Sequence, residues 1–254
     1  MAITIKSERE IELMAEAGKI LERVHNELEK ALHPGMSTKD IDTLGEEIIR
    51  SYGCIPSFLN YNGYPASICA SVNQEVVHGI PDKHRIIHEG DIVSLDAGVI
   101  YKGYHSDAAR THAVGEVTEE AKKLIQVTKE CFFEGIKYAK AGNHLFDISG
   151  AIGRYAEERG YGVVRDLCGH GIGTALHEAP EIPNYEVGRK GVKLRPGMTL
   201  AIEPMINIGT YEVDWLDDDW TVVTRDGSLS AHYENTILIT EGEPRILSLT
   251  CDNE

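Results

Sequence analysis

Residues 90 to 110 read GDIVSLDAGVIYKGYHSDAAR, and this stretch places two acids within segments that otherwise have the composition of buried strands. The run from Asp91 to Leu95 is apolar and β-branched, and Asp96 follows it directly. A second strand is expected from Asp107 to Val114. The two strands and the short polar segment between them predict a β-hairpin.

The spacing of the two acids predicts that they face one another. A four-residue loop from Ile100 to Gly103 would set Asp96 opposite Asp107, with Cβ atoms about 5 Å apart. Two carboxylates at that distance repel each other, so one stays protonated unless a cation joins them. A metal site satisfies this requirement, although two acids at a solvated sheet edge would have the same spacing.

Composition limits the classes of protein to consider. The 254 residues suffice for one large α/β domain or two small ones. The formal charge of −16, from 41 acids against 25 Lys and Arg, argues against broad binding to nucleic acid or anionic membranes. Five scattered cysteines without a Cys-x-x-Cys spacing indicate neither a disulfide framework nor a structural zinc site. With no apolar signal core or membrane span in the sequence, we expect a cytoplasmic protein.

Helix signals occur as two pairs. Ser7 with Glu10 forms a capping box, and apolar residues then recur at helical spacing. The expected helices run from Ser7 to His33, from Ser37 to Tyr52, from Thr118 to Lys140 and from Leu145 to Arg159. Outside them we expect an aromatic pocket loop or sheet edge from Cys54 to Pro65, a strand from Ser67 to Val77 and a hairpin around Arg225-Asp226-Gly227.

The sequence contains an internal repeat. The pattern of Gly35, Asp40 and Gly53 recurs 107 residues later as Gly142, Asp147 and Gly160. The same offset places Asp96 on Glu203, whereas His105-Ser106-Asp107 matches His232-Tyr233-Glu234 at an offset of 127 residues. The second copy therefore contains 20 extra residues between its two acids. We expect a single domain, 1–254, whose halves, 1–116 and 117–254, are related by a pseudo-twofold axis, with the four acids at the junction.

His170 is a fifth candidate ligand. It lies in Cys168-Gly169-His170-Gly171, where glycines allow close approach of the backbone, and at the offset of 107 its counterpart is Gly63. A buried histidine can also be a packing residue. Four carboxylates and a neutral imidazole balance two divalent cations, and mostly oxygen donors favour Mn, Fe(II) or Co over structural zinc. Two-metal sites activate water, so hydrolysis is the expected reaction class.

These residues, in their order and contexts, resemble the type I methionine aminopeptidases, which are metallopeptidases of the pita-bread fold. The resemblance covers essentially the whole chain. Its motifs are His78-Gly79-Ile80-Pro81, Gly169-His170-Gly171-Ile172-Gly173, Leu176-His177-Glu178-Ala179-Pro180 and Ile202-Glu203-Pro204. It implies an α/β (α+β) fold of two pseudo-twofold-related halves, each with helices packed on a curved, mainly antiparallel sheet.

The resemblance also implies a role for each ligand. Asp96 would bind one metal, His170 and Glu203 the other, and Asp107 and Glu234 would bridge both. Glu203 would in addition act as general base on the attacking water. His78 and His177 would contact the scissile amide and stabilise the tetrahedral intermediate, although on sequence grounds either could be a packing residue.

The aromatic loop gains a function from the same resemblance. Tyr61, Tyr64, Cys69 and Trp220 match positions that enclose the methionine side chain, a thioether that packs well against aromatic rings. The other reading is that these rings are ordinary core. Phe58, Asn62 and Leu176 at the rim depart from the residues frequent in bacterial members, which leaves the tightness of the pocket open.

For cofactors and partners, the resemblance implies two divalent ions, with zinc as an alternative to Mn, Fe(II) or Co, and allows a monovalent cation. The substrates would be nascent polypeptide N-termini that carry the initiator methionine before a small residue. A transient ribosome contact and a monomeric state are expected, with no nucleic-acid specificity and no membrane association.

Three other readings remain to be distinguished. X-Pro aminopeptidases and prolidases resemble this site but generally carry an additional N-terminal domain, for which the first helix at Ser7 leaves no room. Type II methionine aminopeptidases usually carry a helical insertion of tens of residues in the second half. Non-enzymatic binding proteins with this fold have lost metal ligands, whereas all five are present here.

Overall fold

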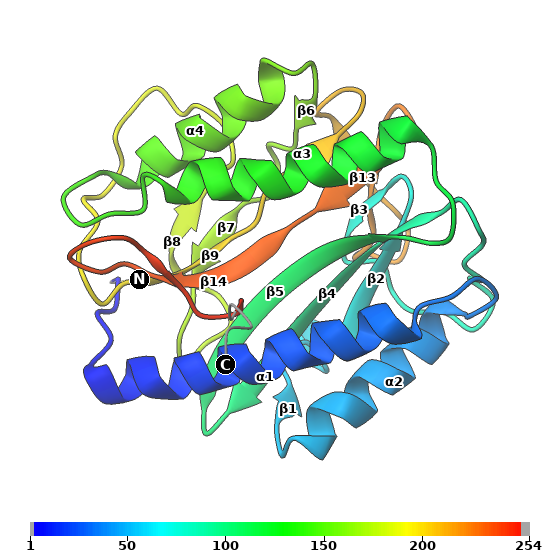
Figure 1. Cartoon of the computed structure of the whole chain (residues 1–254), viewed down its shortest axis with the longest axis horizontal. Coiled ribbons are helices and arrows are strands. Elements are labelled where there is room, and N and C mark those ends of the chain that lie inside the picture. Colours follow the sequence, from blue (N-terminus) through cyan, green and yellow to red (C-terminus); the bar gives the residue numbers. More distant parts are fainter. Residues whose placement is uncertain (1–2, 250–254) are drawn as a thin grey trace.

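The computed structural model describes residues 3–249 and contains two pairs of helices that cover one side of a large sheet (Figure 1). The helices are α1 (Glu8–Ala31), α2 (Thr38–Ser51), α3 (Glu119–Ile136) and α4 (Leu145–Glu157). Their starts follow the predicted caps: Ser7 and Ser37 form capping boxes, and the side chain of Thr118 accepts a hydrogen bond from the Ala121 N–H. α3 ends four residues before Lys140 because the chain leaves it through tight turns at Tyr138 and Ala139.

The main sheet has nine strands, and every neighbouring pair is antiparallel. Along its width the order is β1 (Ile55–Pro56), β4 (Ile92–Tyr101), β5 (Tyr104–Ala113), β14 (Glu234–Leu238), β9 (Thr199–Ile202), β7 (Gly169–Gly171) and β8 (Glu178–Ile182). In addition, β2 (Ile68–Val72) pairs with β4, and β15 (Arg245–Ile246) pairs with β14.

Two three-stranded sheets complete the fold. One contains β13 (Ser230–His232), β10 (Met205–Asn207) and β6 (Gly162–Val163), and the other contains β11 (Val213–Trp215), β12 (Val222–Thr224) and β3 (Glu75–Val77). A short 3-10 helix, η1 (Tyr61–Gly63), lies in the aromatic loop. Strands β10 to β13 all lie between Glu203 and Glu234, so the segment that carries the extra 20 residues of the second repeat forms most of these two sheets.

The strand order agrees with the repeat in the sequence. The pair β4 and β5 lies beside the pair β14 and β9, and the two pairs meet where β5 contacts β14. α1 and α2 pack on the first pair and on β2, whereas α3 and α4 cover the second half of the sheet. Each half has its own buried apolar cluster, with Leu21, Val24 and Leu95 in the first and Leu124, Phe132 and Leu200 in the second.

The hairpin of β4 and β5 is present, but its predicted register is wrong. The turn contains two residues, Lys102 and Gly103, with φ of 49° and 87°, and not the four from Ile100 to Gly103. Two positive φ angles are what a two-residue turn matched to the strand twist requires. As a result Asp96 lies opposite Ala109, and Asp107 lies opposite Gly98. The two acids are diagonal neighbours, and they still share one face because the shift is two residues.

Two other local predictions are also wrong. The strand expected from Ser67 to Val77 is two strands, β2 and β3, which belong to different sheets because the chain turns at Asn73 with φ of 59°. At Arg225 to Gly227 a turn forms, with the Gly227 N–H bonded to the Thr224 carbonyl. The flanking strands β12 and β13 pair with other strands, so this turn does not close a hairpin.

None of the helices within residues 3–249 has both the length and the apolar composition needed to cross a bilayer. Cys54, Cys69, Cys131 and Cys168 are free thiols, as the absence of paired spacings predicts, and Cys251 lies outside the described residues.

Candidate metal centre

Three of the predicted acids lie on neighbouring strands and on one face of the main sheet. Asp96 of β4 and Glu234 of β14 are both paired with Ala109 of β5, which lies between them. Paired residues in a sheet point to the same side, and so do residues two apart along one strand. Asp107 is two residues before Ala109, so its carboxylate lies on that side too.

The remaining two candidates extend this row across the sheet. Asn235 pairs with Ile202, so Glu203 directly follows the end of β9 at the level of Glu234. His170 of β7 pairs with Ala201, which is two residues before Glu203. The strands β4, β5, β14 and β7, together with the residue that directly follows β9, therefore bring the five candidates to the same face of the sheet.

The distances between these groups suit metal coordination. One ligand atom each from Asp107, His170 and Glu234 lies within 4.8 Å of the others. His170 Nε2 is 3.8 Å from Asp107 Oδ2 and 3.6 Å from Glu203 Oε1. Asp96, at the edge of the group, interacts electrostatically with Asp107 and Glu203.

His170 is held in the form that binds metals. Its Nδ1 lies 2.9 Å from the Gly171 carbonyl, to which it donates, so the lone pair of Nε2 faces the carboxylates. Burial, with a smaller contribution from His177, lowers the pKa of His170 to about 3. The ring is therefore neutral at physiological pH.

The rest of the protein compensates the four acids only in part, for example through Arg110, which acts on Glu234. Burial raises the pKa of Asp107 to about 7, and burial together with the neighbouring carboxylates raises the pKa of Asp96, Glu203 and Glu234 well above the ordinary range. Oδ1 of Asp96, Oδ1 of Asp107 and Oε1 of Glu234 have no hydrogen-bond partner among the described residues. Buried, unpartnered carboxylate oxygens beside a neutral imidazole fit divalent cations, which would neutralise them.

A cavity of about 310 Å³ adjoins the acids, and all six residues predicted to bind substrate line it. These are Phe58, Tyr61, Tyr64, Cys69, Leu176 and Trp220. Asn62, Val77, Leu167, Cys168 and Met205 add to the wall, and Asp166 is an acid on it that the sequence did not indicate. The wall is mainly apolar and aromatic, with the acids on one side.

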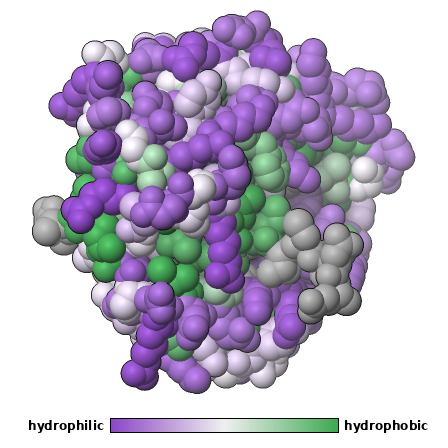
Figure 2. Space-filling model, turned by 60° about the vertical axis from the view of Figure 1, so that its left-hand side comes forward, coloured by the Kyte–Doolittle hydropathy of each residue, from purple (hydrophilic) through white to green (hydrophobic). Residues whose placement is uncertain are grey.

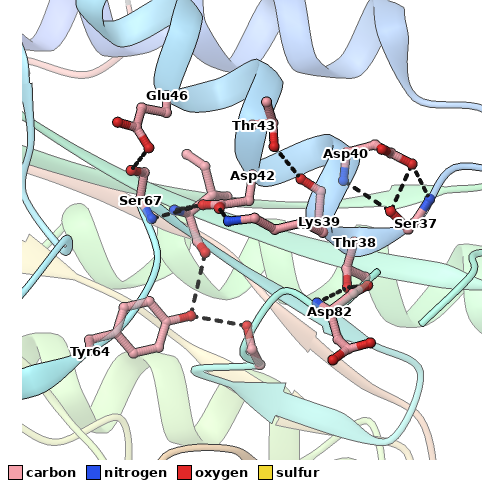
Figure 3. A network of polar contacts seen from close by, with 12 residues as sticks. Ser37, Thr38, Lys39, Asp40, Asp42, Thr43, Glu46, Tyr64, Ser67 and Asp82 are labelled. Carbon is pink, nitrogen blue, oxygen red and sulfur yellow. Dashed lines mark hydrogen bonds and ion pairs between the residues drawn. The ribbon is translucent and has the colours of Figure 1, made fainter. Parts of the chain in front are cut away.

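A polar network that begins on α2 fixes the side of the cavity that Tyr64 forms (Figure 3). Asp42 accepts hydrogen bonds from the backbone N–H groups of Ser67 at 2.8 Å and Ile68 at 3.0 Å. The Tyr64 hydroxyl in turn donates to the Gly79 carbonyl at 3.0 Å. The ring of Tyr64 meets that of Trp220 edge to face at 5.1 Å, so both aromatic faces have defined positions.

The two predicted amide-contacting histidines also line the cavity. His78 has a φ of 59°, an uncommon conformation for a residue other than glycine, and burial lowers its pKa to about 4. The Nδ1 of His177 lies 2.7 Å from the Tyr61 hydroxyl, and its ring lies 4.2 Å from that of His170. Burial lowers the pKa of His177 as well, so both rings are neutral near pH 7.

Two other residues in contact with the site were not predicted. His232 is buried with Nε2 3.6 Å from Glu203 Oε2, and Asn184 donates to the Glu203 carbonyl at 3.0 Å. His232 stands in the repeated His-x-acid pattern, which was the available signal. The sequence contained no signal that pointed to Asn184.

The counterpart of His170 also differs from the expected one. Gly63 lies in η1, outside the sheet. In the pairing of β2 with β4, the position that corresponds to His170 is Ser71, because Ser71 pairs with Ser94 as His170 pairs with Ala201. His170 therefore still has no ligand counterpart in the first half.

Known proteins resemble this chain over its full length. The profile of metallopeptidase family M24 matches residues 12–241. The methionine aminopeptidase of Clostridium acetobutylicum is 58% identical over 97% of this chain and 99% of its own length. The crystal structure of a methionine aminopeptidase from Thermotoga maritima has a TM-score of 0.96 at 47% identity and covers 98% of this chain and 100% of that one.

A second group of structures shares the fold but is longer. An Xaa-Pro dipeptidase from Bacillus anthracis matches with a TM-score of 0.77 at 26% identity, over 98% of this chain but 63% of that chain. The predicted pita-bread fold is confirmed by these matches.

Proposed function

Because the chain belongs to metallopeptidase family M24, we propose that its metal centre hydrolyses the first peptide bond of substrates that begin with methionine. The substrates are nascent proteins and peptides in which a small residue follows the methionine. The row of five candidate ligands across neighbouring strands of one sheet, directly beside a mainly apolar cavity, is the observation that carries this proposal.

Two divalent ions would be held by the five ligands. Asp96 would help to hold one ion, His170 and Glu203 would help to hold the other, and Asp107 and Glu234 would contribute to both. Mn, Fe(II) and Co suit this donor set better than zinc does, since four of the five donors are carboxylates. When bound, the ions lower the pKa of water and polarise the substrate carbonyl.

The protein's own groups manage the protons and orient the amide. Glu203 takes the proton from the attacking water and passes it to the nitrogen of the departing amine. The Tyr61 hydroxyl is hydrogen-bonded to Nδ1 of His177, so Nε2 of the same ring can face the substrate. His78 and His177 donate to the oxygen and nitrogen of the scissile amide as the tetrahedral intermediate forms.

The cavity explains the choice of methionine. Tyr64, Trp220 and Cys69 supply aromatic and sulfur surface to an unbranched thioether, and the buried side chains of Phe58 and Leu176 add apolar surface to the wall. A side chain with a charge would have to give up its hydration there.

Mass spectrometry of Met-Ala-Ser incubated with the protein and Mn²⁺ or Co²⁺ tests the proposal. We expect free methionine and Ala-Ser, and no product with Glu203→Ala. If the wild-type protein binds two divalent ions and leaves the peptide intact, the proposal fails in favour of a binding protein of this fold. Cleavage of an Ala-Pro peptide in preference to Met-Ala-Ser would instead assign an X-Pro peptidase.

A further inference from the structure

Lys6 is a buried lysine in the segment that precedes α1, and it forms an ion pair across the molecule. Its Nζ lies 2.7 Å from Glu178 Oε2 at the start of β8, and both side chains are largely shielded from solvent. The Thr4 hydroxyl donates to the same carboxylate oxygen at 2.6 Å. Two residues of the N-terminal segment therefore converge on one acid of the second half.

Glu178 closes the loop that carries His177. Its other oxygen, Oε1, accepts a hydrogen bond from the Ala175 N–H at 3.3 Å. A Cβ atom on Gly173 would come within 2.4 Å of both Lys6 Cε and Glu178 Oε1. This loop is thus packed tightly against the ion pair at Gly173 and hydrogen-bonded to it at Ala175.

The N-terminal segment is fixed on both sides of Lys6. The Lys6 N–H donates to the Gly197 carbonyl at 2.8 Å, and Ser7 next to it caps α1 together with Glu10. Glu10 also accepts a hydrogen bond from the Tyr104 hydroxyl at 3.0 Å. In Figure 2 the end of the molecule that carries this segment comes forward, and apolar residues gather in its centre between hydrophilic ones.

The imidazole of His177 is also held by two residues that line the substrate cavity. Tyr61 binds its Nδ1, and its ring stacks edge to face on His170. Tyr61 also contacts the backbone of His177, and the loop that carries His177 is closed by Glu178. The position of the imidazole is therefore set jointly by Tyr61 and by the Lys6–Glu178 pair.

The charge on Glu178 depends on the N-terminal segment. Burial alone would raise the pKa of Glu178, but the hydrogen bonds from Lys6 and Thr4 outweigh burial and lower it. Without Lys6, a partly buried carboxylate would remain beside His177 and near His105, with its main cation removed. Such a carboxylate is expected to move toward a new donor and to displace the loop.

We propose that Lys6 is a positioning residue, which acts through Glu178 to hold His177 in its place in the substrate cavity. This inference rests on the proposed function, in which His177 contacts the scissile amide. The N-terminal segment then belongs to the catalytic architecture, although it lies before the first helix and outside the cavity.

A mutant cycle with His177→Ala tests this mechanism. Lys6→Met keeps the length of the side chain without its charge, and we expect kcat on Met-Ala-Ser to fall about 10- to 100-fold, as small misplacements of a catalytic group do. KM should change by less than about twofold. In the His177→Ala background the same change should have no further effect, because the residue through which Lys6 acts is gone. Glu178→Gln is a second variant for the same cycle should Lys6→Met fail to fold.

The NMR signal of the His177 imidazole, assigned by its loss in His177→Ala, provides a readout that does not require activity. We expect it to shift or broaden in Lys6→Met and to stay unchanged in Lys19→Met, which removes an exposed lysine paired with Glu16. An unchanged signal in Lys6→Met, or an equal loss of kcat with and without His177, would overturn the inference. Failure of the wild-type protein to cleave the peptide would refute the proposed function alone, because the imidazole signal still reports the position of His177.

Discussion

Asp96 and Glu234 lie on either side of Ala109, with which both are paired, so only the methyl group of an alanine separates two buried acids on alternate strands. Asp96 comes from the first half of the chain and Glu234 from the second. The junction of the two halves therefore coincides with the proposed metal centre, and Ala109 lies between two of its acids.

Ala109→Leu tests this relationship. A larger side chain at position 109 would intrude between the carboxylates, and we expect the affinity for Mn²⁺, measured by isothermal titration calorimetry, to fall about 10- to 100-fold. Ala108→Leu is the matched control, because Ala108 points to the opposite face, into the core beneath α1 and α2. Overpacking should destabilise both variants by about 1–3 kcal/mol, but only Ala109→Leu should lose metal. Equal metal affinities would contradict the arrangement of the acids.

Glu203 and Glu178 should differ sharply in their importance for turnover. Glu203→Ala removes a ligand and the general base, and kcat should fall by about 10³-fold or more. Glu178 faces Lys6, so Glu178→Ala should retain measurable activity, within the loss of about 100-fold expected when the Lys6 pair is broken. Steady-state kinetics on Met-Ala-Ser would separate the two, and similar activity in both variants would refute the assigned roles.

The raised pKa of Asp107 predicts a pH-dependent stability of the metal-free protein. The pKa is about 7 in the folded state and about 3.9 in an unfolded chain, so between these values the folded protein holds a proton that the unfolded chain has lost. Stability therefore falls as pH rises from about 4 to 7. Asp107→Asn removes the carboxyl that causes this loss of stability. The free energy of unfolding of the variant should therefore exceed that of the wild type by more at pH 8 than at pH 5.

Urea unfolding in the presence of a chelator measures this difference. His170, whose lowered pKa makes stability fall with falling pH below about 6.5, is present in both proteins, so its effect largely cancels. A gain from Asp107→Asn that is independent of pH would contradict the raised pKa. With saturating Mn²⁺ the order should reverse, because the wild-type protein binds the ions more tightly and is stabilised by them.

The confined cavity predicts selectivity for the second residue of the substrate. Peptides of the form Met-Ala-Ser and Met-Gly-Ser should lose methionine, and Met-Lys-Ser should not, since a cavity of about 310 Å³ leaves little room for a long side chain after the scissile bond. Competition between the peptides, followed by mass spectrometry, gives the ratio of kcat/KM directly. Efficient removal of methionine from Met-Lys-Ser would show that the cavity does not select the second residue of the substrate by its size.

The helices could be predicted from the sequence because their signals are local. Capping boxes at Ser7 and Ser37 and the cap at Thr118 set three of the four starts. Strand pairing depends on contacts between segments that are distant in the sequence. The local sequence pattern therefore could not predict the turn at Asn73 or the pairing partners of β12 and β13.

The predicted grouping of Asp96 and Asp107 does not depend on the exact register of the hairpin. The hairpin register was wrong by two residues, and because side chains alternate with a period of two, Asp96 and Asp107 stayed on the same face. A shift of one residue would have separated them. The repeat then located Glu203 and Glu234, since matched strands occupy matched places in the sheet.

Other parts of the site could not be found in this way. The constant offset that assigned Gly63 to His170 fails because the loops of the two halves differ, and register assigns Ser71. For His232 the repeated His-x-acid pattern was the available signal, but by itself that pattern does not distinguish a site residue from a core histidine. The contact between Lys6 and Glu178 joins residues 172 positions apart, and nothing in either local sequence indicates it.

Anomalous diffraction from a crystal of the protein grown with Mn²⁺ and a bound methionine analogue tests the central claim most directly. We predict two anomalous peaks, one beside Asp96 and one beside His170 and Glu203, with Asp107 and Glu234 between them and the analogue's side chain against Tyr64 and Trp220. A single peak, or none within reach of these five ligands, would contradict the dinuclear centre.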